Sequence, residues 1–235
     1  MARQAQIVEE TQVTPEEEVK IDVGRTSLVG NLVCPLGATG IVLFAHGSGS
    51  GRHSPRNRFV AGQLHEVGLA TLLLDLLTEA EEGIDQHTGH LRFDIGFLAE
   101  RLGGAMDWLT GHSTTADLDV GLFGASTGGG AALVAAANRG ERVNAVVSRG
   151  GRPDLAGEAL PRVRAATLLI VGGDDDVVLQ LNQAAFRQLG ASEKDLAVIP
   201  GASHLFEEPG ALEEVAHLAA RWFRRHLNGD AAKSH

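Results

Sequence analysis

Short apolar runs and longer amphipathic stretches alternate along most of the chain. The run 41–44 (IVLF) is apolar throughout, which is typical of a strand buried on both faces. The stretch 56–67 follows it with apolar residues at helical spacing, which predicts a helix with one buried face. The same order then recurs. The pattern predicts strands at 19–23, 27–34, 41–44, 70–74, 120–123, 145–147, 167–171 and 196–199, helices at 56–67, 92–109, 127–138, 179–189 and 212–227, and an acidic loop at 78–85.

This order of elements indicates an α/β fold. The first two strands form an antiparallel pair that turns at Gly24 and Arg25. The later strands each lead into a helix, which predicts a mostly parallel sheet with helices on both faces, joined by right-handed crossovers. Neither an internal repeat nor a break in composition marks a linker. We therefore expect a single domain over residues 17–228, preceded by a flexible arm (1–16) and followed by a tail (229–235).

Composition narrows the classes of partner. Of the 235 residues, 43% are hydrophobic and 21% are charged, which is ordinary for a globular protein. The formal net charge of −10 disfavours binding to nucleic acid and to anionic membranes. The chain lacks an apolar stretch of roughly 20 residues that would span a bilayer, and its first residues are acidic rather than apolar. The prediction is a cytoplasmic protein without membrane attachment.

Two residue counts and one histidine pair restrict the chemistry. The only cysteine, Cys34, has no partner for an internal disulfide, which indicates a reducing compartment. Tyrosine is absent, so a tyrosine acid, including the Tyr-Lys pair of short-chain dehydrogenases, is excluded. His87 and His90 lie near Asp94, but two histidines without a clear third ligand are a weak metal motif. We expect neither a metal ion nor a cofactor.

A candidate nucleophile lies between the strand 120–123 and the helix 127–138. The segment GASTG, centred on Ser126, matches the G-x-S-x-G pattern of a nucleophile elbow, in which glycines allow a tight turn that exposes the serine at the start of a helix. The alternative is a glycine-rich turn that only packs the helix on the sheet. A Walker loop is excluded because Gly129 and Gly130 lead to Ala131, and the spacing does not fit a dinucleotide fingerprint.

A serine nucleophile needs a base and an acid, which follow it in chain order in this type of fold. His204 comes directly after the strand 196–199 and before the last helix, so it is the candidate base among the ten histidines. The strand 167–171 leads into Asp174, Asp175 and Asp176. Strand and turn mechanics do not choose among these three carboxylates, and a solvated acidic turn without a role is the alternative.

Other candidate residues lie after neighbouring strands, at the same edge of the sheet. The backbone N–H of Thr127 and that of Ser48, in the glycine-rich loop after the strand 41–44, are the expected oxyanion donors. Arg149 and Arg52 are candidate binding residues for a substrate carboxylate. For Arg149, an ion pair with one of the aspartates at 174 and 176 is the alternative that we favour slightly.

Taken together, the GASTG, GGDD and GASH segments resemble those of α/β-hydrolases, and in particular the dienelactone hydrolase-like branch. The resemblance runs from about residue 17 to 227, and the loop HGSGSGRHSPRN (46–57) is similar to one in that branch. The acid of that family falls in a Gly-Gly-x-Asp turn, so the resemblance selects Asp175. Dienelactone hydrolases use a cysteine nucleophile, whereas position 126 is serine, which favours general serine esterase chemistry over dienelactone as substrate.

The resulting hypothesis is a serine hydrolase of the carboxylesterase type. It assigns Ser126 as nucleophile, His204 as base and Asp175 as acid, acting on a small-molecule ester through an acyl-enzyme. Members of the superfamily often carry a cap after the strand that here ends near residue 147, but only about twenty residues separate it from the next strand. We therefore expect no substantial cap domain and an open site. A non-catalytic ligand-binding scaffold and an acyltransferase with the same residues are the alternatives.

Overall fold

One eight-stranded sheet organises the computed structural model, which describes residues 15–228. The strand order is β1-β2-β4-β3-β5-β6-β7-β8; β1 and β2 pair antiparallel, β2 pairs antiparallel with β4, and the remaining neighbours are parallel. The strands are β1 (Glu17–Val23), β2 (Thr26–Val33), β3 (Gly40–Ala45), β4 (Ala70–Leu74), β5 (Asp119–Ala125), β6 (Ala145–Arg149), β7 (Ala166–Gly172) and β8 (Lys194–Ile199).

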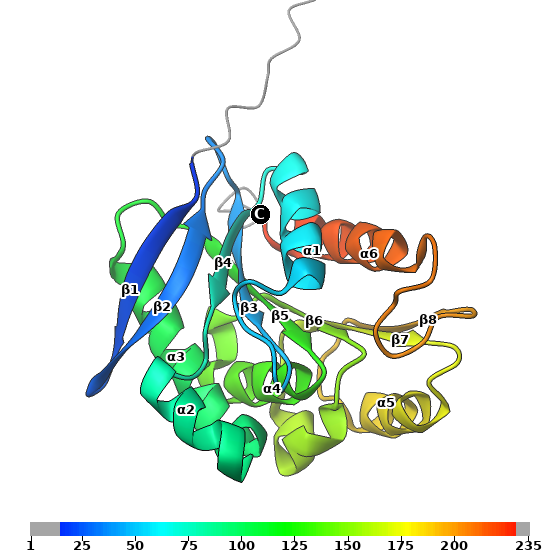
Figure 1. Cartoon of the computed structure of the whole chain (residues 1–235). Helices are drawn as coiled ribbons and strands as arrows, with labels where there is room; N and C mark the ends of the chain where they lie inside the picture. Colours follow the sequence, from blue (N-terminus) through cyan, green and yellow to red (C-terminus); the bar gives the residue numbers. More distant parts are fainter. Residues whose placement is uncertain (1–14, 229–235) are drawn as a thin grey trace, which may run out of the picture.

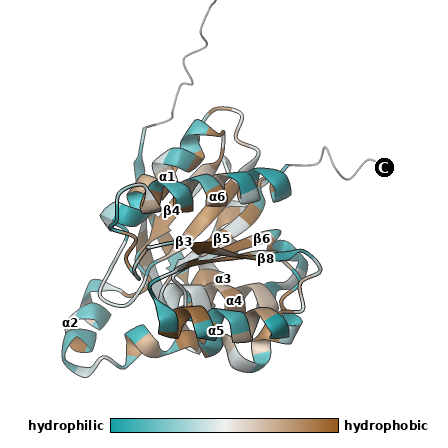
Figure 2. Ribbon diagram, turned by 90° about the vertical axis from the view of Figure 1, so that its right-hand side faces the viewer, coloured by the Kyte–Doolittle hydropathy of each residue, from teal (hydrophilic) through white to brown (hydrophobic). Residues whose placement is uncertain are grey.

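Helices cover both faces of this sheet. They are α1 (Pro55–Glu66), α2 (Glu79–Thr88), α3 (Ile95–Gly111), α4 (Thr127–Arg139), α5 (Asp176–Gln188) and α6 (Ala211–His226), with short 3-10 segments η1 (Leu91–Phe93), η2 (Gly140–Arg142) and η3 (Pro153–Arg162). Helices α1 and α6 lie on one face, and α3, α4 and α5 lie on the other (Figures 1 and 2). The predicted α/β class, with a mostly parallel sheet and helices on both faces, is confirmed.

Each face of the sheet has its own apolar core. On the α1 and α6 face, Val60 and Phe223 pack with Phe44 and Phe123, whose ring centroids are 4.8 Å apart. Residues of α3 and α4 fill the opposite face. Figure 2 shows the apolar strands enclosed between these two helical layers. Because β3 and β5 are buried on both sides, their carboxyl ends are held rigidly where the loop after β3 and the turn at Ser126 begin.

The segment 78–85 differs from its prediction, because most of it belongs to helix α2. Thr78 accepts a hydrogen bond from the N–H of Glu81, and the Glu81 carboxylate accepts one from the N–H of Thr78. This capping box, together with acidic residues in the first turn, stabilises a helix start without an apolar stripe. The prediction of a loop was wrong because it relied on hydrophobic periodicity and overlooked the Thr-x-x-Glu signal.

The connection between β6 and β7 contains only the short segment η3 and no cap domain, as expected. Among the described residues, no helix is long and apolar enough to cross a membrane. Residues 1–14 of the predicted arm and the predicted tail 229–235 lie outside the described residues. Glu16, at the inner end of that arm, is ion-paired with Arg58 of α1 (2.7 Å).

Candidate active site

Ser126 occupies a strained turn between β5 and α4. Its φ and ψ are 51° and −121°, and only one other non-glycine residue among those described, Phe206, has a positive φ. Such a conformation costs on the order of 1–3 kcal/mol and persists only where the surrounding structure enforces it. This backbone is the one expected of a nucleophile elbow.

Close packing explains the two glycines that flank the serine. A Cβ at Gly124 would overlap the backbone of Gly128 and Gly129, and a Cβ at Gly128 would overlap the carbonyl oxygens of Ala45 and His46. Helix α4 therefore approaches the ends of β3 and β5 as closely as backbone allows. The turn at Ser126 depends on these contacts, in agreement with the mechanical role predicted for both glycines.

Backbone hydrogen bonds from the loop after β6 hold the elbow in place. The N–H of Ser126 donates to the carbonyl of Arg149 (3.2 Å), and the N–H of Arg152 donates to the carbonyl of Ser126 (2.9 Å). The buried Asn182 of α5 fixes the same loop by donating from Nδ2 to the carbonyl of Gly151 (3.0 Å). Sequence reasoning missed Asn182, whose only signal is an amide inside the predicted helix 179–189.

The predicted base and acid are in direct contact. His204 Nδ1 lies 2.6 Å from Asp175 Oδ2. With an ionised carboxylate as acceptor, Nδ1 carries the proton and Nε2 is left as a proton acceptor. The Asp175 side chain is 15% exposed and that of His204 is 38% exposed. The carboxylate of the pair is thus mostly shielded from solvent, whereas the imidazole remains accessible from the cavity.

Two backbone hydrogen bonds join the loop that carries Asp175 to the loop that carries His204. The N–H of Gly173 donates to Ile199 (2.8 Å), and that of Asp174 donates to Ala202 (3.0 Å). A Cβ at Gly172 would overlap the carbonyl of Ala202, so the two loops also pack backbone on backbone. Asp174 and Asp176, by contrast, are exposed. The geometry therefore distinguishes Asp175 from its two neighbours.

Ser126 and His204 line one cavity of about 270 Å³, together with Ser48 and Arg149. The cavity lies at the carboxyl ends of β3, β5 and β6, where ligands bind in open α/β sheets. No hydrogen bond between Ser126 and His204 is present in the described part of the chain. Catalytic hydrogen bonds are often loose in unliganded enzymes and shorten when substrate binds.

The two expected oxyanion donors differ in the structure. Thr127 is the first residue of α4, so its N–H has no intrahelical acceptor, and within residues 15–228 it makes no other hydrogen bond. The N–H of Ser48 instead donates to the Thr127 side-chain oxygen (3.0 Å). This bond ties the loop after β3 to the start of α4. Ser48 must turn or share its proton before it binds an oxyanion.

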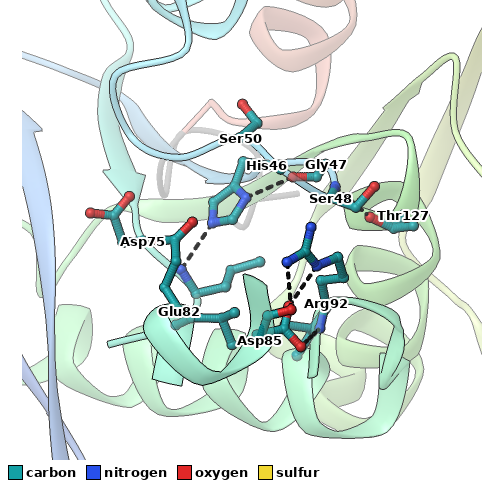
Figure 3. A pocket seen from close by; sticks show the side chains of 13 residues that line it. His46, Gly47, Ser48, Ser50, Asp75, Glu82, Asp85, Arg92 and Thr127 are labelled. Carbon is teal, nitrogen blue, oxygen red and sulfur yellow. Dashed lines mark hydrogen bonds and ion pairs between the residues drawn. The ribbon is translucent and has the colours of Figure 1, made fainter. Parts of the chain in front are cut away.

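A neutral histidine supports the loop that contains Ser48. His46 is half-buried; its Nε2 accepts from the N–H of Leu76 (3.0 Å), and its Nδ1 lies 3.0 Å from the carbonyl of Gly47 (Figure 3). Because the amide N–H of Leu76 can only donate, Nε2 must be unprotonated. The ring proton is therefore on Nδ1, which donates it to the Gly47 carbonyl. Burial is the main cause that lowers the pKa of His46, against the opposing effects of the Gly47 carbonyl, Asp75 and Glu82. The sequence placed His46 in a loop without assigning it this role.

Of the two arginines considered as substrate-binding residues, only Arg149 lines the Ser126 cavity. Arg52 lies outside the Ser126 cavity: its Nη1 is 2.5 Å from Asp75 and its Nη2 is 3.0 Å from Glu18. Arg52 was a candidate residue for binding a substrate carboxylate, and the structure instead pairs its guanidinium with the carboxylates of Glu18 and Asp75. Arg149 does line the cavity, and no ion pair joins it to Asp174 or Asp176 within residues 15–228.

The residues weighed as metal ligands have local hydrogen-bonding roles. His87 Nδ1 is 3.1 Å from the carbonyl of Gly83, and Asp94 caps α3 by accepting from the N–H of Phe97 (3.0 Å). Over residues 15–228, no group of three or more histidine, cysteine or acidic side chains is arranged to hold a metal ion.

The sheet order, the elbow and the His–Asp pair define an α/β-hydrolase. A PET hydrolase-like family model matches residues 105–235. The crystal structure of dienelactone hydrolase from Anabaena variabilis is 65% identical, with a TM-score of 0.89, over 91% of this chain and 98% of that one. The chain belongs to the dienelactone hydrolase-like branch of the α/β-hydrolase superfamily, as the motifs predicted.

More distant and longer relatives complete the comparison. Est1E from Butyrivibrio proteoclasticus shares the fold, with 17% identity, a TM-score of 0.73 and coverage of 89% of this chain and 98% of that one. Two proteins of Mycobacterium tuberculosis strains, each named "Putative phosphoribosyl transferase", are 56% identical over 214 residues. These residues are 91% of this chain but 47% of those proteins. The chain thus spans about half the length of the curated relatives it matches.

The bond between Ser48 and Thr127 generates a first prediction. Thr127→Val keeps the shape of the side chain but removes the acceptor, so the Ser48 amide loses its partner and the loop loses a tie to α4. We expect kcat for an ester substrate to fall about 5- to 50-fold, or about 1–2.3 kcal/mol, because the loop that carries the Ser48 amide is no longer held beside the start of α4, with KM little changed. Thr127→Ser, which restores the oxygen, should stay within a few-fold of the native chain. Equal activity in all three chains would contradict this role.

The neutral state of His46 generates a second prediction, on stability. Its pKa is lowered in the folded chain, so between that pKa and the unfolded value of about 6.5 the unfolded state binds more protons. The contribution of neutral His46 is therefore complete above about pH 6.5 and is lost as the pH falls below it. Denaturant titrations at pH 7.5 and 5.5 should show a smaller loss of unfolding free energy in His46→Gln than in the native chain. The exposed His217→Gln serves as control, and an undiminished loss in His46→Gln would refute the assignment.

Proposed function

We propose that this chain is a serine hydrolase of the carboxylesterase type that cleaves small carboxylic esters. The observation that carries the proposal is the strained turn at Ser126, which opens into the same cavity as His204, whose Nδ1 is 2.6 Å from Asp175. A serine held at positive φ beside a carboxylate-oriented imidazole fits nucleophilic catalysis. A turn that only packed a helix on the sheet would need neither the strain nor the His–Asp pair.

The proposed reaction has two halves. Ser126 Oγ attacks the ester carbonyl while His204 Nε2 accepts the hydroxyl proton, and the tetrahedral intermediate collapses to an acyl-serine as His204 returns that proton to the leaving alcohol. A water molecule then attacks the acyl-serine, again with His204 as base, and releases the acid and free Ser126. Asp175 keeps Nδ1 protonated and stabilises the imidazolium in both halves.

Negative charge develops on the former carbonyl oxygen in each tetrahedral intermediate. The free N–H of Thr127 is directed from the start of α4, where the helix dipole also favours an anion. Ser48 is the proposed second donor, once its N–H is released from or shared with the Thr127 hydroxyl.

The size of the cavity favours small substrates. Its volume of about 270 Å³ is at or below the lower end of typical small-molecule sites, and no cap extends over it. Acyl transfer to an acceptor other than water would use the same residues, and a non-catalytic scaffold would keep only the fold. Product analysis with added alcohols or amines distinguishes acyl transfer from hydrolysis. We do not carry over phosphoribosyl transfer, because the relatives so named extend well beyond the aligned half.

The catalytic proposal makes a third prediction. Ser126→Ala should lose at least about 1,000-fold in kcat on 4-nitrophenyl butyrate while folding normally, because the nucleophile is removed. The native chain should be labelled by a fluorophosphonate at Ser126, which mass spectrometry of the peptide would identify. Unchanged turnover in Ser126→Ala would reject the mechanism, and native chain that resists labelling and hydrolyses no ester would favour the scaffold.

The three consecutive aspartates provide a matched control for the same assay. Asp175→Asn should lower kcat by about 1,000-fold or more, because it disturbs the tautomer of His204. Asp174→Asn and Asp176→Asn change the charge equally but leave the His204 contact intact, so both should retain activity within about threefold. A similar loss in all three would mean that only the charge of the turn matters.

The open, small cavity makes a fourth prediction. Across 4-nitrophenyl esters of increasing acyl length, kcat/KM should be highest for short acyl groups and fall for chains longer than the cavity accommodates. The series is measured below the micelle concentration of each ester. A preference for long-chain esters or triglycerides would contradict the proposed substrate size.

A further inference from the structure

The cavity at Ser126 is positively charged, although the chain as a whole carries a net charge of −10. Two arginines, Arg149 and Arg56, line it, and no aspartate or glutamate does. The carboxylate of Asp175 lies behind His204 rather than on the cavity wall. The cavity wall therefore carries positive charge beside Ser126, where the proposed substrate would bind.

Arg149 is buried without a charged partner. The residue is only 7% exposed, and within residues 15–228 its Nε and Nη1 have no hydrogen-bond partner and no carboxylate pairs with it. A buried cation is costly unless it is paired, because it gives up its hydration. Most other arginines of the described chain have carboxylate partners, as Arg52 has. The unpaired state of Arg149 therefore needs an explanation that lies outside its own neighbours.

The surrounding backbone holds this arginine against the cavity wall. Arg149 is the last residue of β6, and its carbonyl accepts the hydrogen bond from Ser126. Its guanidinium carbon lies 5.9 Å from the centre of the Phe206 ring, and Phe206 itself is buried at a positive φ of 57°. Burial and the nearby charge of Arg56 lower the pKa of Arg149 to about 10, so it stays cationic at neutral pH.

Arg56 brings the second positive charge from a different element. It lies in the first turn of α1, and within residues 15–228 its one ion pair is with Glu207 (3.2 Å), whose side chain is 66% exposed. Its Nε is buried without a partner. An exposed ion pair is weak and easily exchanged, so Arg56 can turn its charge toward a ligand.

We infer that the substrate of this site carries a compact anionic group, a carboxylate or a phosphate, which Arg149 binds with the help of Arg56. The inference rests on the proposed esterase function and adds a substrate class to it. Guanidinium groups bind such oxyanions through charge-assisted, often bidentate hydrogen bonds. A ligand of this kind would satisfy the donors that the protein leaves unpaired.

The test compares two esters of similar length, mono-4-nitrophenyl glutarate, which is anionic, and 4-nitrophenyl hexanoate, which is neutral. In the native chain kcat/KM should be higher for the glutarate. Arg149→Met should reduce the glutarate-to-hexanoate ratio about 10- to 100-fold, the effect of losing one charge-assisted contact. Arg56→Gln should reduce it less, and Arg149→Lys should recover part of it. Arg58→Gln, on the same helix but paired with Glu16 outside the cavity, should leave the ratio unchanged.

Inhibition of hexanoate hydrolysis in the native chain separates the two anions. If inorganic phosphate is a stronger competitive inhibitor than propionate, the site is a phosphate site. If propionate is the stronger inhibitor, it is a carboxylate site. If neither anion competes and the native chain prefers hexanoate, the inference is overturned. The inference is also overturned if the two substitutions, Arg149→Met and Arg56→Gln, slow hydrolysis of both esters equally. A purely structural role of these arginines would produce that equal loss.

A binding measurement keeps this inference separate from the proposed function. Calorimetric titration of Ser126→Ala with mono-4-nitrophenyl glutarate should show binding that is lost in Ser126→Ala combined with Arg149→Met. If that result is found but the native chain hydrolyses neither ester, the anion site stands and the esterase proposal fails. If hydrolysis occurs with no dependence on substrate charge, the esterase proposal stands and the anion site fails.

Discussion

Helix α4 packs backbone against backbone on the ends of β3 and β5, and the rest of the site depends on this contact. At Gly124 and Gly128 the backbones are so close that a methyl group would not fit, and the chain between them must turn through a conformation that serine rarely adopts. The buried apolar face of α4 supplies the packing energy that holds this turn. The free amide at Thr127 and the position of Ser126 both follow from the same contact.

Because the strands are parallel, residues that are far apart in the sequence meet at one edge of the sheet, next to the turn at Ser126. Asp175 and His204 are 29 positions apart, yet the neighbouring strands β7 and β8 end at the same edge of the sheet and their loops share two backbone hydrogen bonds. The same edge receives Arg149 from β6 and Ser48 from the loop after β3. The serine at the strained turn, the imidazole paired with Asp175 and the positively charged cavity wall thus lie side by side because the sheet is parallel.

Much of the fold was predictable because its strands are buried on both faces, so runs such as 41–44 carry an unambiguous apolar signal. Helix α2 was not recognised, since a capping box rather than an apolar stripe begins it. The candidate residues Ser126, Asp175 and His204 were selected by motif and by order along the chain. Side-chain partners were beyond that reasoning: the pairing of Arg52 with Asp75 and the Ser48–Thr127 bond depend on loop conformations that short polar segments do not encode.

Strand β8 lies at the margin of the sheet and pairs only with β7, and its face is only partly covered. His204 follows this strand by five positions, so the imidazole is carried by a loop that leaves an edge strand of the sheet. Edge strands open at lower free energy than central ones. Detachment of β8 would remove the imidazole from the serine while the central strands stay folded. Loss of the site therefore requires only fraying of this border strand and not unfolding of the whole domain.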